Sequence, residues 1–222
     1  SHAVEPGPPI KPMIRVEPGP RFSIGDISID LRDVVLAPAD QAAIDEAGVL
    51  DAGDIAIPKD IIAQEAGYLA VLKSLGYADA RALKRRNLGD RETATLDIVY
   101  RLRPGPKVRF GEVKFDDGVR TRRAYLERII PFEPGETYSP EALSTFNTRL
   151  SESRLYDVSS ARLDEEPAQV DADGSVVRDV AVTLIERDRY TLSAGTSIST
   201  SEGPGLTTSL TRRNATRRGD TL

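Results

Sequence analysis

The sequence predicts an α+β protein of two tandem β-α-α-β-β modules followed by the first strands of a truncated β-barrel. Three observations support this prediction. One pattern of strands, helices and turn residues occurs twice at a nearly constant offset, and each copy holds apolar residues at strand and helix spacings. From Arg187 onward the chain alternates between apolar and small polar residues, which neither module does.

The repeat is clearest at three pairs of positions. Gly25 pairs with Gly111, an offset of 111 − 25 = 86, within two similar ten-residue segments that begin at Arg21 and Lys107. The other two pairs, Gly53 with Gly135 and Asp97 with Asp179, share an offset of 135 − 53 = 179 − 97 = 82. We therefore assign residues 21–106 to a first module and residues 107–186 to a second. The proline-rich residues 1–20 form a linker, and residues 187–222 form the start of the barrel.

Each module opens with a strand in which apolar and polar residues alternate, at 22–31 and at 108–115. A short helix follows at 38–47 and, with Thr121 as its N-cap, at 121–130. A longer helix then begins at Pro58 and at Pro140, because proline suits a first helical turn. We expect its buried stripes to be Ile62, Ala66, Leu69 and Leu72 in the first module, and Leu143, Phe146 and Leu150 in the second.

Two strands close each module, at 80–86 and 93–102 and at 158–163 and 176–185. Turn-forming residues lie between them, at 87–90 in the first module and at 171–174 in the second. The second turn carries Asp171 and Asp173, which invites a calcium site. Gly174 comes too early for an EF-hand loop, so we expect a solvated hairpin loop instead.

The last segment predicts strands of a barrel wall. Tyr190, Leu192, Ala194 and Ile198 share one face of a strand, and small polar residues share the other. A second strand of the same kind runs over 206–213. An apolar face toward lipid and a polar face toward water are typical of outer-membrane barrels. Two strands cannot close such a wall, so we expect the barrel to be truncated here.

Composition excludes several classes of function. The 222 residues include no cysteine and a single histidine, His2, which rules out disulfides, thiol catalysis and most metal centres. We expect no enzymatic activity, no cofactor and no bound metal. The net charge of −5 argues against nucleic-acid binding, because phosphate neutralisation needs a basic surface. A basic cluster does occur at Arg212, Arg213, Arg217 and Arg218, but it lacks the interleaved aromatic residues on which bases stack. No apolar run is long enough for a membrane-spanning helix, and the one methionine, Met13, suggests an excised segment.

The repeated motifs resemble those of polypeptide-transport-associated (POTRA) domains. They are the openings Phe22-Ser23-Ile24-Gly25 and Val108-Arg109-Phe110-Gly111, the loops Leu50-x-x-Gly53-Asp54 and Phe132-x-x-Gly135-Glu136, and the helix ends Ser74-Leu75-Gly76-Tyr77 and Ser153-Arg154-Leu155-Tyr156. The tail from Leu192 to Leu222 resembles the barrel start of the BamA and TamA superfamily, the bacterial surface antigens. The segments Pro131-Phe132-x-Pro134-Gly135-x-x-Tyr138 and Leu143-x-x-x-Asn147-x-Arg149-Leu150 are most similar to the TamA family.

The resemblance implies an outer-membrane assembly factor whose POTRA domains lie in the periplasm. Such proteins bind unfolded outer-membrane protein substrates, and TamA-like members act with a TamB-like inner-membrane partner in the insertion of autotransporters and other outer-membrane proteins. Two alternatives remain open at this point. One is a two-partner secretion transporter, which also has two POTRA domains before a barrel, and the other is a soluble periplasmic structural or interaction module.

An exposed strand edge can accept an extended peptide through main-chain hydrogen bonds. We therefore expect substrate or partner binding at the strand that precedes the last strand of each module. The predicted edge residues are Ala82, Leu83, Lys84, Arg85 and Arg86 in the first module, and Ser160, Ala161, Arg162 and Leu163 in the second. The charges at Lys84, Arg85 and Arg86 also have a simpler interpretation, since charge on an edge strand discourages unwanted pairing.

Overall fold

The computed structural model describes residues 19, 21–32, 34–188, 190–199 and 203–212. The predicted linker lies almost wholly outside these residues, as do His2, Met13 and most of the C-terminal arginine cluster. The first module contains β1 (Ser23–Asp30), α1 (Pro38–Glu46), α2 (Pro58–Ser74), β2 (Arg81–Ala82), β3 (Arg86–Asp90) and β4 (Thr95–Arg103). The second contains β5 (Val108–Phe115), α3 (Arg123–Ile129), α4 (Pro140–Glu152), β6 (Tyr156–Leu163), β7 (Gln169–Val170) and β8 (Val176–Glu186).

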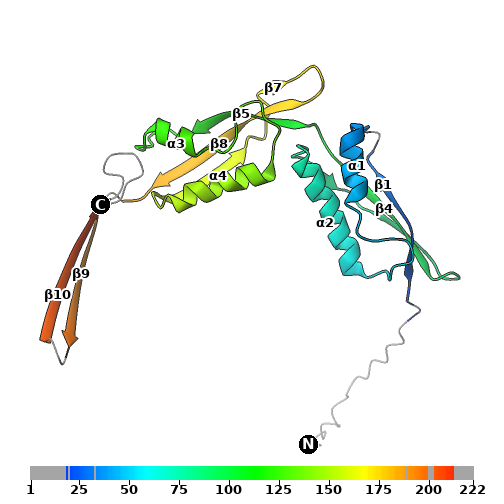
Figure 1. Cartoon of the computed structure of the whole chain (residues 1–222), viewed down its shortest axis with the longest axis horizontal. Coiled ribbons are helices and arrows are strands. Elements are labelled where there is room, and N and C mark those ends of the chain that lie inside the picture. Colours follow the sequence, from blue (N-terminus) through cyan, green and yellow to red (C-terminus); the bar gives the residue numbers. More distant parts are fainter. Residues whose placement is uncertain (1–18, 20, 33, 189, 200–202, 213–222) are drawn as a thin grey trace, which may run out of the picture.

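A hairpin of β9 (Tyr190–Ser199) and β10 (Gly203–Arg212) follows the second module. Figure 1 shows the two modules next to each other along the chain, with the hairpin beyond the second. Each module has the predicted β-α-α-β-β order, with one short additional strand. The α+β prediction of two tandem modules is therefore confirmed.

Each sheet is organised around its last strand. In the first sheet β4 pairs in parallel with β1 on one side and antiparallel with β2 and β3 on the other. In the second sheet β8 has the same position, between β5 and the pair β6 and β7. Parallel neighbours need a crossover connection, which the two helices of each module supply.

The two modules have separate cores. Ile24, Ile44, Leu72, Ile98 and Leu102 are fully buried in the first, where the rings of Tyr68 and Tyr100 meet edge to face with centroids 5.3 Å apart. In the second, Phe110 stacks on Phe132 at 3.9 Å between centroids, and Phe132 meets Phe146 edge to face at 5.9 Å. Five of the twelve aromatic residues of the chain thus lie at the centres of the cores.

A β-bulge interrupts the parallel pair of each sheet. The register shifts between Ile24 and Ile27 in the first module, where Asp97 Oδ1 accepts a hydrogen bond from the Asp26 N–H at 2.8 Å. In the second module, Asp179 Oδ1 accepts from the Glu112 N–H at 2.8 Å. A Cβ atom on Gly25 or Gly111 would collide with the carboxylate oxygen of Asp97 or Asp179. The repeat therefore keeps glycine and aspartate together because each bulge needs both.

The stripe predicted for the first long helix is confirmed at Leu72, which is buried, and at Leu69, which packs against the core, but Ile62 and Ala66 are exposed. The buried residues of α2 are Ile61, Gln64, Tyr68 and Leu72, whereas Ile62 is 55% exposed. The cause is Gln64, a polar residue at a core position. Its Oε1 accepts from the N–H groups of Val49 and Leu50 at 3.0 and 2.6 Å, and its Nε2 donates to the Tyr68 hydroxyl at 2.8 Å. In α4, Phe146 and Leu150 are buried as predicted, and Leu143 packs against the core.

Two further local predictions are wrong. Residues 87–90 belong to β3 rather than to a turn, and the chain reverses after them, where Asp90 Oδ1 accepts from the Glu92 N–H and Ala94 takes a φ of 52°. Thr121 is not an N-cap, because α3 starts after Arg122 and the Thr121 hydroxyl donates to Glu186 instead. The turn predicted at 171–174 is present, closed by a hydrogen bond from the Asp171 N–H to the Ser175 carbonyl at 2.8 Å.

Replacement of Gly111 by alanine should strongly destabilise the second module. The new Cβ meets the Asp179 carboxylate and must displace it from the Glu112 N–H, so we expect a loss of roughly 2–4 kcal/mol in unfolding free energy. Gly67→Ala, in the interior of α2 with open space around it, is the matched control and should stabilise by up to about 1 kcal/mol. Equal unfolding midpoints of the two variants in urea would contradict this account.

Stability should also fall in acid through Asp179. Its pKa is lowered by the hydrogen bond from Lys114, whose Nζ lies 2.6 Å from Oδ2, and by the Glu112 N–H, against an opposing effect of burial. A carboxyl group with a lowered pKa in the folded state stabilises the folded protein at any pH above its unfolded-state pKa of about 3.9. This stabilisation is lost as the pH falls through the folded-state pKa. Urea unfolding should give the wild type a higher free energy of unfolding than Asp179→Asn at pH 7, and this difference should narrow below about pH 4. A gap independent of pH would exclude the carboxylate charge as its source.

Candidate functional site

The edges of the two sheets are the candidate binding sites, and the edges formed by β1 and β5 are closed over their first halves. The Ile24 N–H donates to the Asp54 carbonyl at 2.7 Å, and the Gly53 N–H donates back to the Ile24 carbonyl at 2.8 Å. Phe110 exchanges the same two bonds with Glu136 and Gly135, at 2.8 and 2.7 Å. Gly53 and Gly135 have φ angles of 96° and 91°, which explains glycine in both loop motifs.

The predicted edge of the first module lies on the outer side of β4, in β2 and β3. Ala82 belongs to β2, Arg86 begins β3, and Leu83, Lys84 and Arg85 connect them. Leu83 faces inward, because its N–H donates to the Arg101 carbonyl at 2.8 Å. Arg85 is half-buried, and its guanidinium lies 3.3 Å from the Glu65 carboxylate.

Alternation along β3 identifies its outward backbone groups. The Arg101 carbonyl of β4 points toward β3, so the backbone N–H and C=O groups of the other odd-numbered residues of β4 point the same way. Their partners in β3, which are Arg86, Leu88 and Asp90, therefore direct their backbone groups inward, toward β4. Asn87 and Gly89 therefore present their N–H and C=O groups at the free edge. Sequence reasoning missed both residues because it took them for a turn.

The predicted edge of the second module lies in β6, the outer neighbour of β8. The Asp164 N–H points inward, since it donates to the Asp179 carbonyl of β8 at 2.9 Å. Because backbone groups alternate along a strand, those of Ser160 and Arg162 also point toward β8. Ala161 and Leu163 point outward, as does Ser159. Of the four predicted residues, two therefore carry edge groups and two are already bonded within the sheet.

The outward groups of Ala161 are bonded to a side chain of α4. The Asn147 Oδ1 accepts from the Ala161 N–H at 2.8 Å, and its Nδ2 donates to the Ala161 carbonyl at 2.9 Å. The same Nδ2 donates to the Leu143 carbonyl at 3.0 Å, which fixes the amide on its helix. Asn147 was noted in the sequence only as part of a motif, and spacing alone could not show which backbone group it contacts.

The second module docks onto the end of α2. The connecting residues are Pro104, Gly105 and Pro106, and the first strand residue, Val108, donates its N–H to the Gly76 carbonyl at 2.8 Å. Gly76 has a φ of 101° and leaves no room for a Cβ beside Thr137 and Lys107 of the second module. Backbone contact at this point ties the orientation of the second module to α2.

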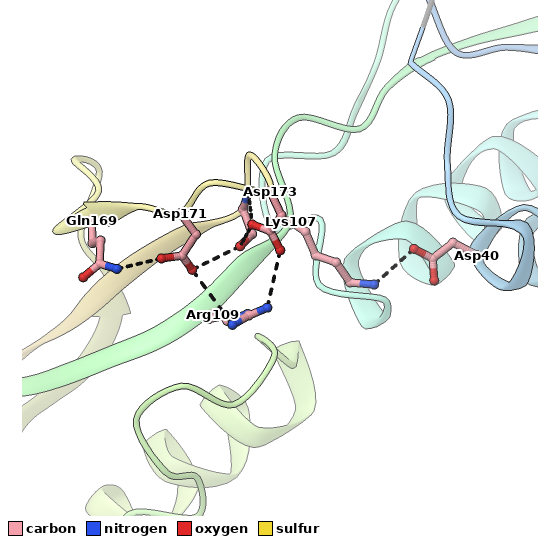
Figure 2. A network of polar contacts seen from close by, with 7 residues as sticks. Asp40, Lys107, Arg109, Gln169, Asp171 and Asp173 are labelled. Atoms are coloured by element: carbon pink, nitrogen blue, oxygen red, sulfur yellow. Dashed lines mark hydrogen bonds and ion pairs between the residues drawn. The ribbon is translucent and has the colours of Figure 1, made fainter.

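Charged side chains hold the same junction. Figure 2 shows Lys107 reaching Asp40 of α1, with Nζ 3.1 Å from Oδ2. The Tyr77 hydroxyl donates to the same oxygen at 2.9 Å, and burial together with this carboxylate raises the pKa of Tyr77 to about 12. Arg178 forms a two-pronged pair with Asp79 across the modules, at 3.0 and 2.6 Å.

The acidic turn at 171–174 lies beside this junction, and its two carboxylates contact side chains of the second module. Arg109 approaches Asp171 and Asp173 at 3.9 and 3.6 Å, and Gln169 donates to Asp171 at 2.6 Å (Figure 2). Ser175 donates to both carboxylates as well. Among the described residues, no group of histidine, cysteine, aspartate and glutamate side chains has the arrangement of a metal site.

The hairpin presents one apolar face. Leu192 of β9 is paired with Leu210 of β10, and Tyr190 and Leu206 lie on the same face by strand alternation. All four side chains are between 54% and 75% exposed. Separately, the part of the chain that the structure describes contains no helix long and apolar enough to cross a membrane.

No protein-family model matches the chain, whereas solved structures match its fold. The crystal structure of BamA from Haemophilus ducreyi lacking POTRA domains 1–3 aligns with a TM-score of 0.69 and 17% identity, over 91% of this chain and 36% of that one. The POTRA3–5 structure of Haemophilus influenzae BamA aligns with a TM-score of 0.53 and 19% identity, over 74% of this chain and 61% of that one. The chain thus spans less than two thirds of either structure. It has the fold of tandem POTRA domains, as its sequence motifs predicted.

Proposed function

We propose that the chain is the periplasmic part of an outer-membrane assembly factor of the BamA and TamA superfamily, whose POTRA modules bind unfolded outer-membrane protein chains. The observation that carries the proposal is the extent of the likeness to BamA. Residues 1–186 make up 186/222 = 84% of the chain, so an alignment over 91% must include part of the segment that holds the hairpin. Two POTRA modules followed directly by a hairpin with an exposed apolar face suit a protein that has an outer-membrane barrel.

The strand edges supply a chemistry suited to unfolded chains. Backbone N–H and C=O groups at Asn87 and Gly89 can pair with any extended segment, since main-chain hydrogen bonds do not depend on side-chain identity. The fixed junction would hold this edge at a constant orientation to the barrel start. An assembly factor needs both properties, because its substrates differ in sequence and must arrive at one place.

The finer proposal is a TamA-like factor in the outer membrane that acts with a TamB-like inner-membrane partner and supports the insertion of autotransporters and other outer-membrane proteins. Its support is the motif around Phe132 and Asn147. Phe132 lies between Phe110 and Phe146 in the aromatic core, and Asn147 bonds the β6 edge. Both motif residues thus have defined structural roles in the membrane-proximal module.

Asn87→Pro tests the role of the first edge. The Asn87 N–H points away from β4, so proline removes an edge donor without breaking the bond ladder of the sheet. One hydrogen bond is worth about 1 kcal/mol, so we expect the Kd for a urea-denatured outer-membrane porin, diluted into buffer and followed by fluorescence anisotropy, to rise about fivefold. Asn87→Ala keeps the backbone donor and serves as the control. Equal binding by both variants would remove this edge from the proposed function.

A further inference from the structure

The outer edge of the first module, formed by β2 and β3, and that of the second module, formed by β6, differ in how their backbone groups are bonded. In the second module α4 lies along β6, and the Asn147 amide bonds both outward groups of Ala161. An added antiparallel strand would use the same N–H and C=O groups. Toward Ala161 the amide uses one donor and one acceptor, as a peptide unit of a neighbouring strand does, while its second N–H donates to Leu143. Asn147 therefore fills the position of a strand at the middle of this edge.

The first module has no such amide. The position equivalent to Asn147 is 147 − 82 = 65, which holds Glu65, and the same offset pairs the buried Gln64 and Tyr68 with Phe146 and Leu150. A carboxylate only accepts hydrogen bonds, so it cannot satisfy a strand carbonyl. Glu65 instead pairs with Arg85 at 3.3 Å. All five residues of β3 are exposed.

Charge separates the two edges as well. The open edge of the first module carries the exposed cations Arg81, Lys84 and Arg86 and one exposed carboxylate, Asp90, at the end of β3. The edge of the second module carries one exposed cation, Arg162, and Asp157 at its start pairs with Arg187 at 3.0 Å. The exposed carboxylates of Glu165 and Glu166 follow it, so its charge is less positive than that of the first edge. An extended segment with acidic residues is therefore attracted more strongly to the first edge than to the second.

We propose that strand addition takes place at the β2–β3 edge of the first module, that this edge prefers extended segments carrying aspartate or glutamate, and that Asn147 excludes such segments from β6. The inference rests on the proposed function and makes its binding site specific. It also gives the charges of β2 and β3 a role in choosing the partner rather than only in preventing self-association.

The test is amide hydrogen exchange of the full chain with a synthetic ten-residue peptide of alternating valine and threonine, flanked by two aspartates at each end. The peptide should slow exchange at Asn87 and Gly89 and leave Ser159 and Leu163 unchanged. The same peptide with lysine flanks should bind at least tenfold more weakly. Protection at β6, or at Ile27, Ile29, Val113 or Phe115 on the opposite edges, would overturn the assignment, as would equal binding of the two peptides.

Asn147→Ala is the decisive variant, with Thr148→Ala as its control because Thr148 is exposed and bonds only its own helix at Ser144. Without peptide, Asn147→Ala should speed exchange of the Ala161 N–H about fivefold. With a peptide of the same core and lysine flanks, which suits the less positive surroundings of β6, it should create new protection at Ser159, Ala161 and Leu163. Asn147→Asp keeps the acceptor and loses the donor, so it provides a second variant if Asn147→Ala unfolds.

These outcomes separate the inference from the proposed function. Peptide protection at β3 with no gain at β6 in either Asn147 variant would overturn the role of Asn147 and leave the proposed function standing. Absence of peptide protection at every edge would instead count against strand addition as the binding mode, and with it against both.

Discussion

Each module depends on one contact, in which an aspartate of the central strand bonds a backbone N–H at the bulge of the neighbouring parallel strand. A bulge leaves one peptide group without a partner in the sheet, and an N–H that is removed from water without an acceptor is costly. This cost applies most to the second module, where the bond is partly buried, since the bond in the first module is exposed. Asp97 and Asp179 supply the missing acceptor, and Gly25 and Gly111 leave room for it. The contact lies at the register shift of each parallel pair. The antiparallel pairing of β3 and β6 on the other side of the central strand decides which of their backbone groups point outward.

The free edges of the two sheets are covered to different extents. Loops with glycine at positive φ cover the first halves of β1 and β5. An amide from α4 covers the middle of β6, whereas β3 carries no comparable contact from α2 among the described residues. An uncovered strand edge invites aggregation unless it is charged or used, and β3 lies beside a run of cations. The pattern suits the proposed receptor of unfolded chains, because the exposed edge of β3 offers backbone groups at a defined place in the first module.

The sequence predicted what is repeated and missed what differs between the copies. Paired glycines, the prolines at the starts of α2 and α4 and the alternation in β1 and β5 all follow from local backbone rules, so they could be recognised without a structure. The burial of Gln64 could not be recognised in this way, because it depends on a loop far away in the sequence whose N–H groups donate to the Gln64 side chain. Asn87 and Gly89 have the composition of a turn, yet tertiary pairing with β4 places them in a strand. Asn147 shows the same limit, since helix spacing gives its position but not its partner.

Photo-crosslinking in bacterial cells that produce the protein tests the central claim most directly. A benzophenone amino acid at Leu88, on the exposed β3, should crosslink to outer-membrane proteins during their synthesis, and the same amino acid at Val158 on β6 should not. Crosslinks of that kind confined to Leu88 are the result that the open edge of the first module predicts. Equal crosslinking at both positions, or crosslinking at Val158 alone, would contradict the account.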